Sequence, residues 1–250
     1  MTGAHRLIIG PEPQRIDDSK RMLIKIATRR SEILQCQYFI AEIYNSAYNI
    51  VFSSDIADLD QAIEPYPDRY VMGLIDGKLV AAAGLYIRRT YVATYGGITD
   101  DEIDTKITEA NMSHRYSAKR KREYTKLVVR GNYNGLGIGR FFHAATHSRS
   151  FLEIDSSEPN VLLVCAKQSI YRSMYSANRI QTRILKPFPH YAVHEKYCSP
   201  DDPMDSRLII PEIDIAPQWY NLPLPGEFSL QEIKQRAAKE IRDEPGPVSW

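Results

Sequence analysis

Apolar positions divide the chain into stretches with helical spacing and stretches typical of strands. Between Lys20 and Phe52, apolar residues recur every three or four positions, which predicts one or two amphipathic helices, with Ser31 capping the second. Two apolar runs within residues 70–87 flank Asp76-Gly77, a turn sequence typical of β-hairpins. Residues 88–121 lack clear periodicity and predict a long loop with a short helix near Asp100–Thr108.

The second half of the chain alternates between the two patterns. A strand over 123–129 is followed by a turn rich in Gly and Asn, a helix over about 137–151, a second apolar strand over 161–166 and a helix around 169–177. This order implies a crossover connection onto a sheet, so the fold class is α/β with a mixed sheet. Further strands are predicted near residues 180–185, 190–194 and 207–210.

The tail from Pro211 is rich in proline up to Gly226. Ser229 and Glu232 then form a capping box ahead of a helix that extends to about Arg242. The predicted organisation is a leader over 1–21, one domain over 22–210 and a C-terminal extension with a helix over 211–250.

The composition argues against several functional classes of protein. The 250 residues carry a net charge of +1, with 43% hydrophobic and 25% charged residues, which is typical of a globular protein and argues against nucleic-acid binding. Three cysteines are too few for a disulfide framework, and no apolar run approaches 18 residues. The sequence therefore predicts a cytoplasmic protein that binds neither nucleic acid nor membrane. It leaves the oligomeric state open, a homodimer included.

The strongest chemical signal is the segment 132–140, Asn-Tyr-Asn-Gly-Leu-Gly-Ile-Gly-Arg, between a predicted strand and a predicted helix. Glycines allow a ligand to approach the backbone, and the free amides at a helix N-terminus favour an anion such as a phosphate or diphosphate. The spacing G-x-G-x-G matches neither the Rossmann fingerprint nor the Walker loop. A simple turn is the alternative interpretation.

This strand and the loop resemble motif A of the GNAT superfamily, usually written Arg/Gln-x-x-Gly-x-Gly/Ala. The resemblance implies a central mixed, twisted sheet with splayed parallel strands, flanked by helices. It also implies that backbone amides hold the pyrophosphate of coenzyme A or the phosphopantetheine of an acyl carrier protein. The expected cofactor-binding residues are Leu127, Val128, Val129, Asn134, Gly135, Leu136, Gly137, Ile138, Gly139 and Arg140.

A second motif supports the resemblance. Residues 174–180, Met-Tyr-Ser-Ala-Asn-Arg-Ile, are similar to the family's Leu-Tyr-x-x-x-Gly-Phe, which implies that Tyr175 is the general acid toward the leaving thiolate. Asn134, Gln168 and Arg179-Ile180 depart from the family pattern. Residues 123–129, Glu-Tyr-Thr-Lys-Leu-Val-Val, are similar to a strand of acyl-homoserine-lactone synthases and N-acyl amino acid synthases, GNAT-like enzymes that often use carrier-protein thioesters.

The chemistry of acyl transfer requires a base for the amine and a donor for the developing oxyanion. Glu123 is the candidate base, with a solvated strand-end carboxylate as the alternative, and backbone amides near Leu127–Val129 are candidate oxyanion donors. The basic run 119–122 would meet coenzyme A phosphates or an acidic carrier protein, or simply lie in solvent. His190 and His194 lack partners for a metal set, so no metal is expected.

These observations predict an N-acyltransferase. It would move an acyl group from an acyl-CoA (acetyl-CoA or longer) or acyl-carrier-protein thioester to a small-molecule amine by direct attack. Two alternatives remain open. One is a catalytically silent acyl-CoA-binding sensor or scaffold module. The other is a GNAT-fold enzyme with a different thioester reaction, hydrolysis or decarboxylation.

Overall fold

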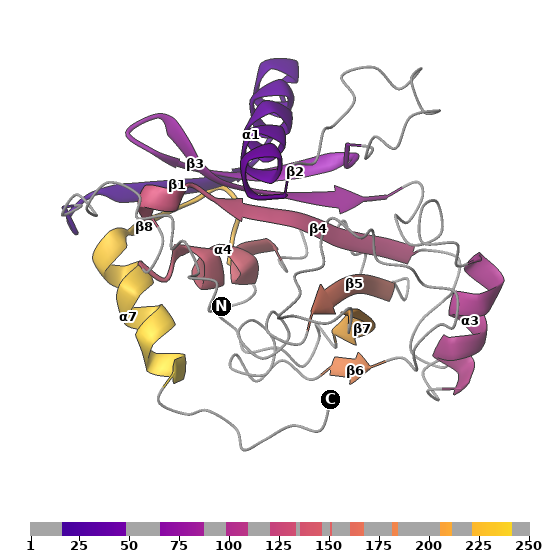
Figure 1. Ribbon diagram of the computed structural model, residues 1–250. Coiled ribbons are helices and arrows are strands. Elements are labelled where there is room, and N and C mark those ends of the chain that lie inside the picture. The colour runs from indigo at the N-terminus through magenta and orange to yellow at the C-terminus, as the bar shows by residue number, and fades with distance from the viewer. Residues whose placement is uncertain are drawn as a thin grey trace, which may run out of the picture.

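A computed structural model of the protein shows an eight-stranded sheet with helices on both faces (Figure 1). It describes residues 17–48, 66–87, 99–109, 121–133, 136–146, 151, 161–167, 182–184, 206–211 and 222–241. The predicted helix at 169–177 and the predicted strand at 190–194 lie outside these ranges.

The sheet is mixed, as the sequence predicts. The strands lie in the order β6-β7-β5-β4-β3-β2-β1-β8. β4 and β5 run parallel, and each other pair of neighbours is antiparallel. The strands are β1 (Arg21–Ile26), β2 (Arg69–Ile75), β3 (Lys78–Tyr86), β4 (Lys121–Val129), β5 (Val161–Lys167), β6 (Thr182–Ile184), β7 (Ser206–Pro211) and β8 (Gly226–Ser229).

The parallel pair lies at the centre of the sheet. Its paired residues run from Lys121 opposite Val161 to Tyr124 opposite Val164, whereas β4 continues to Val129 and β5 to Lys167. The connection between them contains the 3-10 turn η2 (Gly131–Tyr133) and the helix α4 (Ile138–Thr146), as parallel strands require a crossover. The carboxyl ends of two parallel strands therefore lie beside the glycine-rich loop.

Helices cover both faces of the sheet (Figure 1). α1 (Arg30–Tyr48) lies on one face, and α4 and α7 (Leu230–Ile241) lie on the other. The centre of β3 is a run of fully buried alanines, Ala81, Ala82 and Ala83. Because these side chains are small and point alternately to the two faces, helices can pack closely on both sides.

The N-terminal element differs from the prediction. Residues 21–26 form the strand β1, and helix α1 covers residues 30–48. Met22 and Ile24 are fully buried on one face of the sheet, which is the two-residue alternation of a strand. This alternation is only six residues long and directly precedes a helical pattern, so the prediction of one or two helices from Lys20 is wrong for residues 21–26.

The C-terminal segment adds an edge strand to the sheet and a helix that covers one of its faces. β8 pairs with β1 at the sheet edge, and Leu230 and Ile233 of α7 are fully buried in the core beneath α4. The predicted cap at Ser229 is confirmed, because the Glu232 amide donates to Ser229 Oγ at 3.1 Å, whereas the Glu232 carboxylate accepts from Arg236 Nη2 at 2.9 Å. The strand β8 itself was not predicted, since four residues after a proline-rich stretch carry little periodicity.

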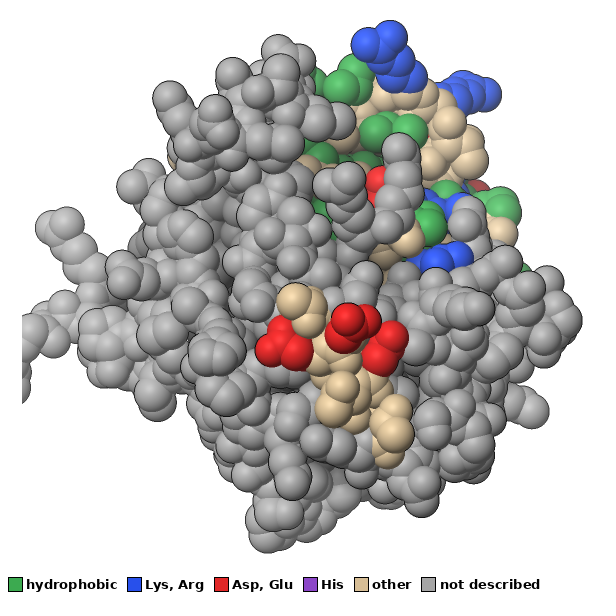
Figure 2. All heavy atoms as spheres, turned by 90° about the vertical axis from the view of Figure 1, so that its right-hand side faces the viewer, with side chains coloured by type: hydrophobic (Ala, Val, Ile, Leu, Met, Phe, Trp, Pro, Cys, Tyr) green, Lys and Arg blue, Asp and Glu red, His purple; other side chains and the backbone are tan. Residues whose placement is uncertain are grey.

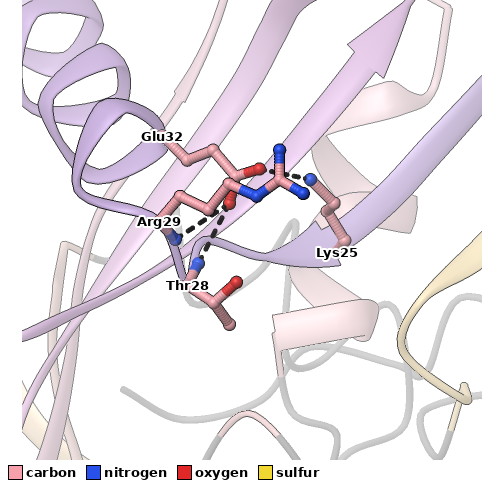
Figure 3. Close-up of polar contacts among 4 residues, drawn as sticks. All are labelled: Lys25, Thr28, Arg29 and Glu32. Carbon is pink, nitrogen blue, oxygen red and sulfur yellow. Dashed lines mark hydrogen bonds and ion pairs between the residues drawn. The ribbon is translucent and has the colours of Figure 1, made fainter.

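The turn between β1 and α1 is held by one carboxylate (Figure 3). Glu32 accepts from Lys25 Nζ at 2.6 Å and from the backbone amides of Thr28 and Arg29 at 3.1 and 3.2 Å. Helix α1 begins at Arg30, so Glu32, and not the predicted Ser31, satisfies the free amides at its start. The hydrogen bond from Lys25, followed by those from the two amides, lowers the pKa of Glu32 from 4.5 to about 2.

Glu32→Gln is expected to lower the free energy of unfolding at pH 7 by about 2 kcal/mol, because the ion pair and part of the helix cap are lost. A lowered folded-state pKa contributes stability above the unfolded value of 4.5, and that contribution disappears as the pH falls toward 2. The difference between variant and wild type should therefore shrink between pH 7 and pH 3. Urea unfolding at both pH values measures it, and an unchanged difference would contradict this assignment.

Candidate functional site

A β-bulge interrupts β4. Gly84 of β3 lies opposite Thr125 and Ala82 lies opposite Val128, so Ala83 faces two residues, Lys126 and Leu127. Lys126 has a left-handed backbone, with φ of 58°. A non-glycine residue in this region is energetically unfavourable, and such strain persists where the surrounding structure fixes it, often at functional sites.

The bulge changes which residues of β4 share a face. In a regular strand, residues two apart point the same way. Here the Tyr124 ring packs edge-on against the His143 ring of α4, with centroids 5.5 Å apart, whereas Lys126 Nζ lies 5.0 Å from the centroid of the Tyr44 ring in α1. After the bulge, side chains therefore point to the opposite face of the sheet from the one that the alternation before the bulge would give them.

The bulge gathers charged residues on the α1 face of β4. Glu123 lies opposite Tyr86 and Leu163, with 1% of its surface exposed, and strand alternation places it on the face opposite to Tyr124. Lys126, with 6% exposed, and then Arg130 follow on the same face. The Arg130 guanidinium lies 4.9 Å from the Phe39 ring centroid and 3.4 Å from Glu42 Oε1.

The described part of the glycine-rich loop has the conformation of a tight turn into a helix. Gly137 has φ of 77°, and its carbonyl accepts from the Phe141 amide at 3.0 Å, in the i to i+4 pattern of the first turn of α4. The amides of Ile138, Gly139 and Arg140 precede that bond and have no acceptor within the helix. They lie at the positive end of the helix dipole, the feature that favours an anionic ligand.

Helix α7 packs against the flank of this loop. A Cβ atom on Gly137 would lie 2.5 Å from Ala237 Cβ and 3.8 Å from the Ile233 carbonyl oxygen. Arg140 Nη1 donates to the Ala237 carbonyl at 3.3 Å. The Arg140 guanidinium, expected from the sequence to meet a phosphate, is thus directed to α7.

The remaining predicted loop and strand residues are mostly packed into the core. Ile138 is fully buried, and Leu127, Val129 and Leu136 pack against the same core on the α4 side of the sheet. Val128 is buried on the α1 side. Their side chains are therefore not candidates for ligand contact.

Several predicted residues lie outside the described ranges. They include the proposed general acid Tyr175, the loop residues Asn134 and Gly135, and the departures Gln168 and Arg179-Ile180. Lys119 and Arg120 also lie outside, whereas Arg122 of the same basic run is buried in β4 with 9% exposed. Among the described residues, the structure places Glu123 near the start of β4 and the loop from Leu136 to Arg140 after the end of that strand.

Two buried groups, Cys36 and Tyr124, are unsuited to nucleophilic chemistry. Burial raises the pKa of Cys36 to about 12, with a further contribution from the charge of Glu32, so the thiol stays protonated. Burial also raises the pKa of Tyr124 well above its ordinary value, although a hydrogen bond with Thr146 opposes that shift. Among the described residues, no group of three or more His, Cys, Asp or Glu side chains is placed to hold a metal ion.

An acidic surface lies at the other end of β4 from the loop. Helix α3 (Asp100–Glu109) begins with a capping box in which Thr99 and Glu102 exchange hydrogen bonds of 2.7 to 3.2 Å. In the view of Figure 1 it lies on the same side of the molecule as the start of β4. Figure 2 shows acidic side chains gathered on this face, where Asp101 is exposed and Glu102 and Asp104 are partly exposed. Exposed carboxylates of this kind attract cations.

Two features of the site were not predicted. The sequence places Lys126 in a strand but gives no sign of a bulge, because no glycine or proline marks the position. The contact between Gly137 and Ala237 joins residues 100 positions apart, which local periodicity does not reveal. The small size of both residues is the only sequence feature compatible with such a close approach.

Comparisons with known proteins give matches among solved structures only. No protein-family model matches the sequence, and no curated protein matches it. Within the ranges that the structure describes, no helix combines the length and the apolar character needed to cross a bilayer.

Three solved structures illustrate the similarity. FeeM, an N-acyl amino acid synthase from uncultured soil microbes, matches with a TM-score of 0.44 and 9% identity, over 77% of this chain and 90% of that chain. The acyl-homoserine-lactone synthase LasI matches with a TM-score of 0.48 and 11% identity, over 80% of this chain and 93% of that chain. An acetyltransferase of the GNAT family from Staphylococcus aureus Mu50 matches with a TM-score of 0.40 and 13% identity, over 75% and 98% of the two chains.

Proposed function

We propose that the protein is an N-acyltransferase that transfers an acyl group from a coenzyme A or carrier-protein thioester to a small-molecule amine. One observation carries the proposal. A left-handed glycine and the N-terminus of helix α4 follow a bulged strand, at the carboxyl end of the parallel pair. Ligands of open sheets with crossover helices commonly bind at the carboxyl ends of parallel strands.

The loop from Leu136 to Arg140 is the proposed site for the diphosphate or phosphopantetheine group. Gly137 leaves the backbone without a Cβ at the turn, and the amides of Ile138, Gly139 and Arg140 are suited to phosphate oxygens. We further propose that Asn134 and Gly135 complete this loop, and that β4 and β5 splay apart beyond Tyr124 and Val164, where their pairing ends. A pantetheine arm could then lie alongside the backbone of β4.

In the proposed reaction, Glu123 accepts a proton from the amine as its nitrogen attacks the thioester carbonyl carbon. Backbone amides of Leu127–Val129 donate to the developing oxyanion, and the nearby cation of Lys126 lowers the free energy of that negative charge. The tetrahedral intermediate then collapses, the C–S bond breaks, and the leaving thiolate takes a proton. Tyr175 is proposed as the donor of that proton on the basis of the motif resemblance alone.

The charge distribution favours an amine acceptor that arrives at the end of β4 opposite to the loop. Glu123 lies near the start of β4, and α3 places acidic residues beside that end. A protonated amine would be drawn toward this face before it loses its proton. The two substrates would thus approach from opposite ends of the same strand.

The test is a transfer assay with purified protein. The donors are acetyl-CoA, octanoyl-CoA and an octanoyl-loaded acyl carrier protein, each combined with a panel of amines and amino acids. We expect one donor to give release of free thiol that depends on the amine, with a matching acylated amine in the mass spectrum. Donor binding without turnover would instead support a silent sensor module, and thiol release with free acid would support hydrolysis. Absence of donor binding would refute the proposed site.

A further inference from the structure

The C-terminal helix α7 contacts the proposed diphosphate loop at the residue that gives the loop its shape. A Cβ on Gly137 would overlap Ala237 Cβ, at 2.5 Å, so both positions require small side chains. The Arg140 guanidinium donates to the Ala237 carbonyl oxygen, which fixes the first turn of α4 to the same turn of α7. The loop and α7 are therefore held by steric fit and by a hydrogen bond.

The contact extends from the loop along the first turn of α4. Gly137 faces Ala237, and the Phe141 ring centroid lies 5.8 Å from the Arg236 guanidinium of α7. The Phe141 ring also meets the Phe228 ring of β8 edge-on, with centroids 4.9 Å apart. α7 therefore packs against α4 from the loop to the first turn of the helix.

The start of α7 is anchored far from the loop. The Leu230 and Gln231 amides donate to the carbonyls of Lys20 and Asp18 at 2.8 and 3.2 Å, and Lys234 Nζ pairs with the Asp18 carboxylate. β8 ties the preceding residues to β1. A helix that is fixed at its start and in contact with Gly137 near its end can hold the loop in a single position.

We propose that Ala237, on the buried face of α7, is a positioning residue for the thioester-carrier site and holds the loop at Gly137. This inference rests on the proposed function, because it assigns the loop to the carrier. It adds that the contact between Ala237 and Gly137, remote in sequence from each other, influences the affinity for the carrier. Binding at the loop and docking of α7 are then linked, so each stabilises the other.

The first test compares two substitutions on α7. Ala237→Leu places a large side chain against the loop, whereas Gln235→Leu makes a change of similar character at an exposed position of the same helix. For the donor that the wild type uses, we expect Ala237→Leu to raise KM about tenfold or more, with the amine KM within twofold of wild type. Gln235→Leu should leave both values unchanged. An unchanged donor KM in a folded Ala237→Leu variant would overturn the inference.

The second test uses the wild type and does not depend on whether a variant folds. Amide hydrogen exchange is measured with and without saturating octanoyl-CoA or octanoyl carrier protein. We expect slower exchange both in peptides that contain residues 136–141 and in peptides of α7. Protection of the loop without any change in α7 would overturn the inference and leave the proposed function standing. No binding at all would refute the proposed function itself.

Discussion

Replacing Glu123 by glutamine is expected to lower kcat by about a hundredfold or more, with the donor KM unchanged. Glutamine keeps the size and hydrogen-bonding capacity of the side chain but cannot accept the proton of an attacking amine. Glu123 is almost fully buried between β3 and β5, so the neutral isostere tests the proton transfer with the least change in packing. Steady-state kinetics with the donor and amine identified in the transfer assay measure the effect.

The matched control is Glu227→Gln. Glu227 is also a strand glutamate, but its side chain is 59% exposed and pairs with Arg21 at 3.3 Å on the edge strand. It should retain wild-type kcat, because exposed ion pairs contribute little and this one is remote from β4 in the sheet order. A Glu123→Gln variant with kcat within threefold of wild type would refute the role of general base. A thermal melt of each variant shows whether lost activity reflects lost structure.

Gly137→Ala is expected to lower the free energy of unfolding by about 3 kcal/mol, the largest stability effect of the changes considered. A left-handed alanine costs about 1–2 kcal/mol, and relief of the overlap with Ala237 adds roughly 1–3 kcal/mol. For a chain of this length, the melting temperature should fall by roughly 6–12 °C. Differential scanning calorimetry or urea unfolding measures it.

Gly77→Ala separates the two contributions. Gly77 has a similar φ, 72°, but a Cβ there would meet no heavy atom within 4 Å, so only the backbone cost of about 1 kcal/mol applies. In the Gly137→Ala background, Ala237→Gly should restore part of the stability even though glycine weakens a helix by itself. Equal losses at positions 77 and 137, or no coupling between positions 137 and 237, would contradict the steric interpretation.

Elements that are specified by a few neighbouring residues were predictable from the sequence. The Asp76-Gly77 pair predicted a tight hairpin, and both residues have positive φ, 51° and 72°. The apolar runs at 123–129 and 161–166 correspond to the central parallel strands, and Ser229 with Glu232 predicted the start of α7. Each of these signals operates within a few residues of the chain.

Features that depend on distant contacts were not predictable. β8 is a strand because β1 offers it an edge, and Arg21 meets Ser229 across more than two hundred residues. The left-handed conformation of Lys126 is imposed by packing against α1 and by the register of β3, and a lysine gives no local preference for it. Within the candidate site, the loop and Glu123 were named from the sequence and stay predictions, whereas the bulge and the contact of α7 with Gly137 were not predicted.

The pairing of β1 with β8 has a consequence for biosynthesis. During translation the outer edge of β1 would have no partner until more than two hundred further residues had left the ribosome. An unpaired edge is a template for association with other chains, and contacts of such long sequence separation slow folding. Nascent chains that stall before residue 226 would therefore be exposed to aggregation and dependent on chaperones.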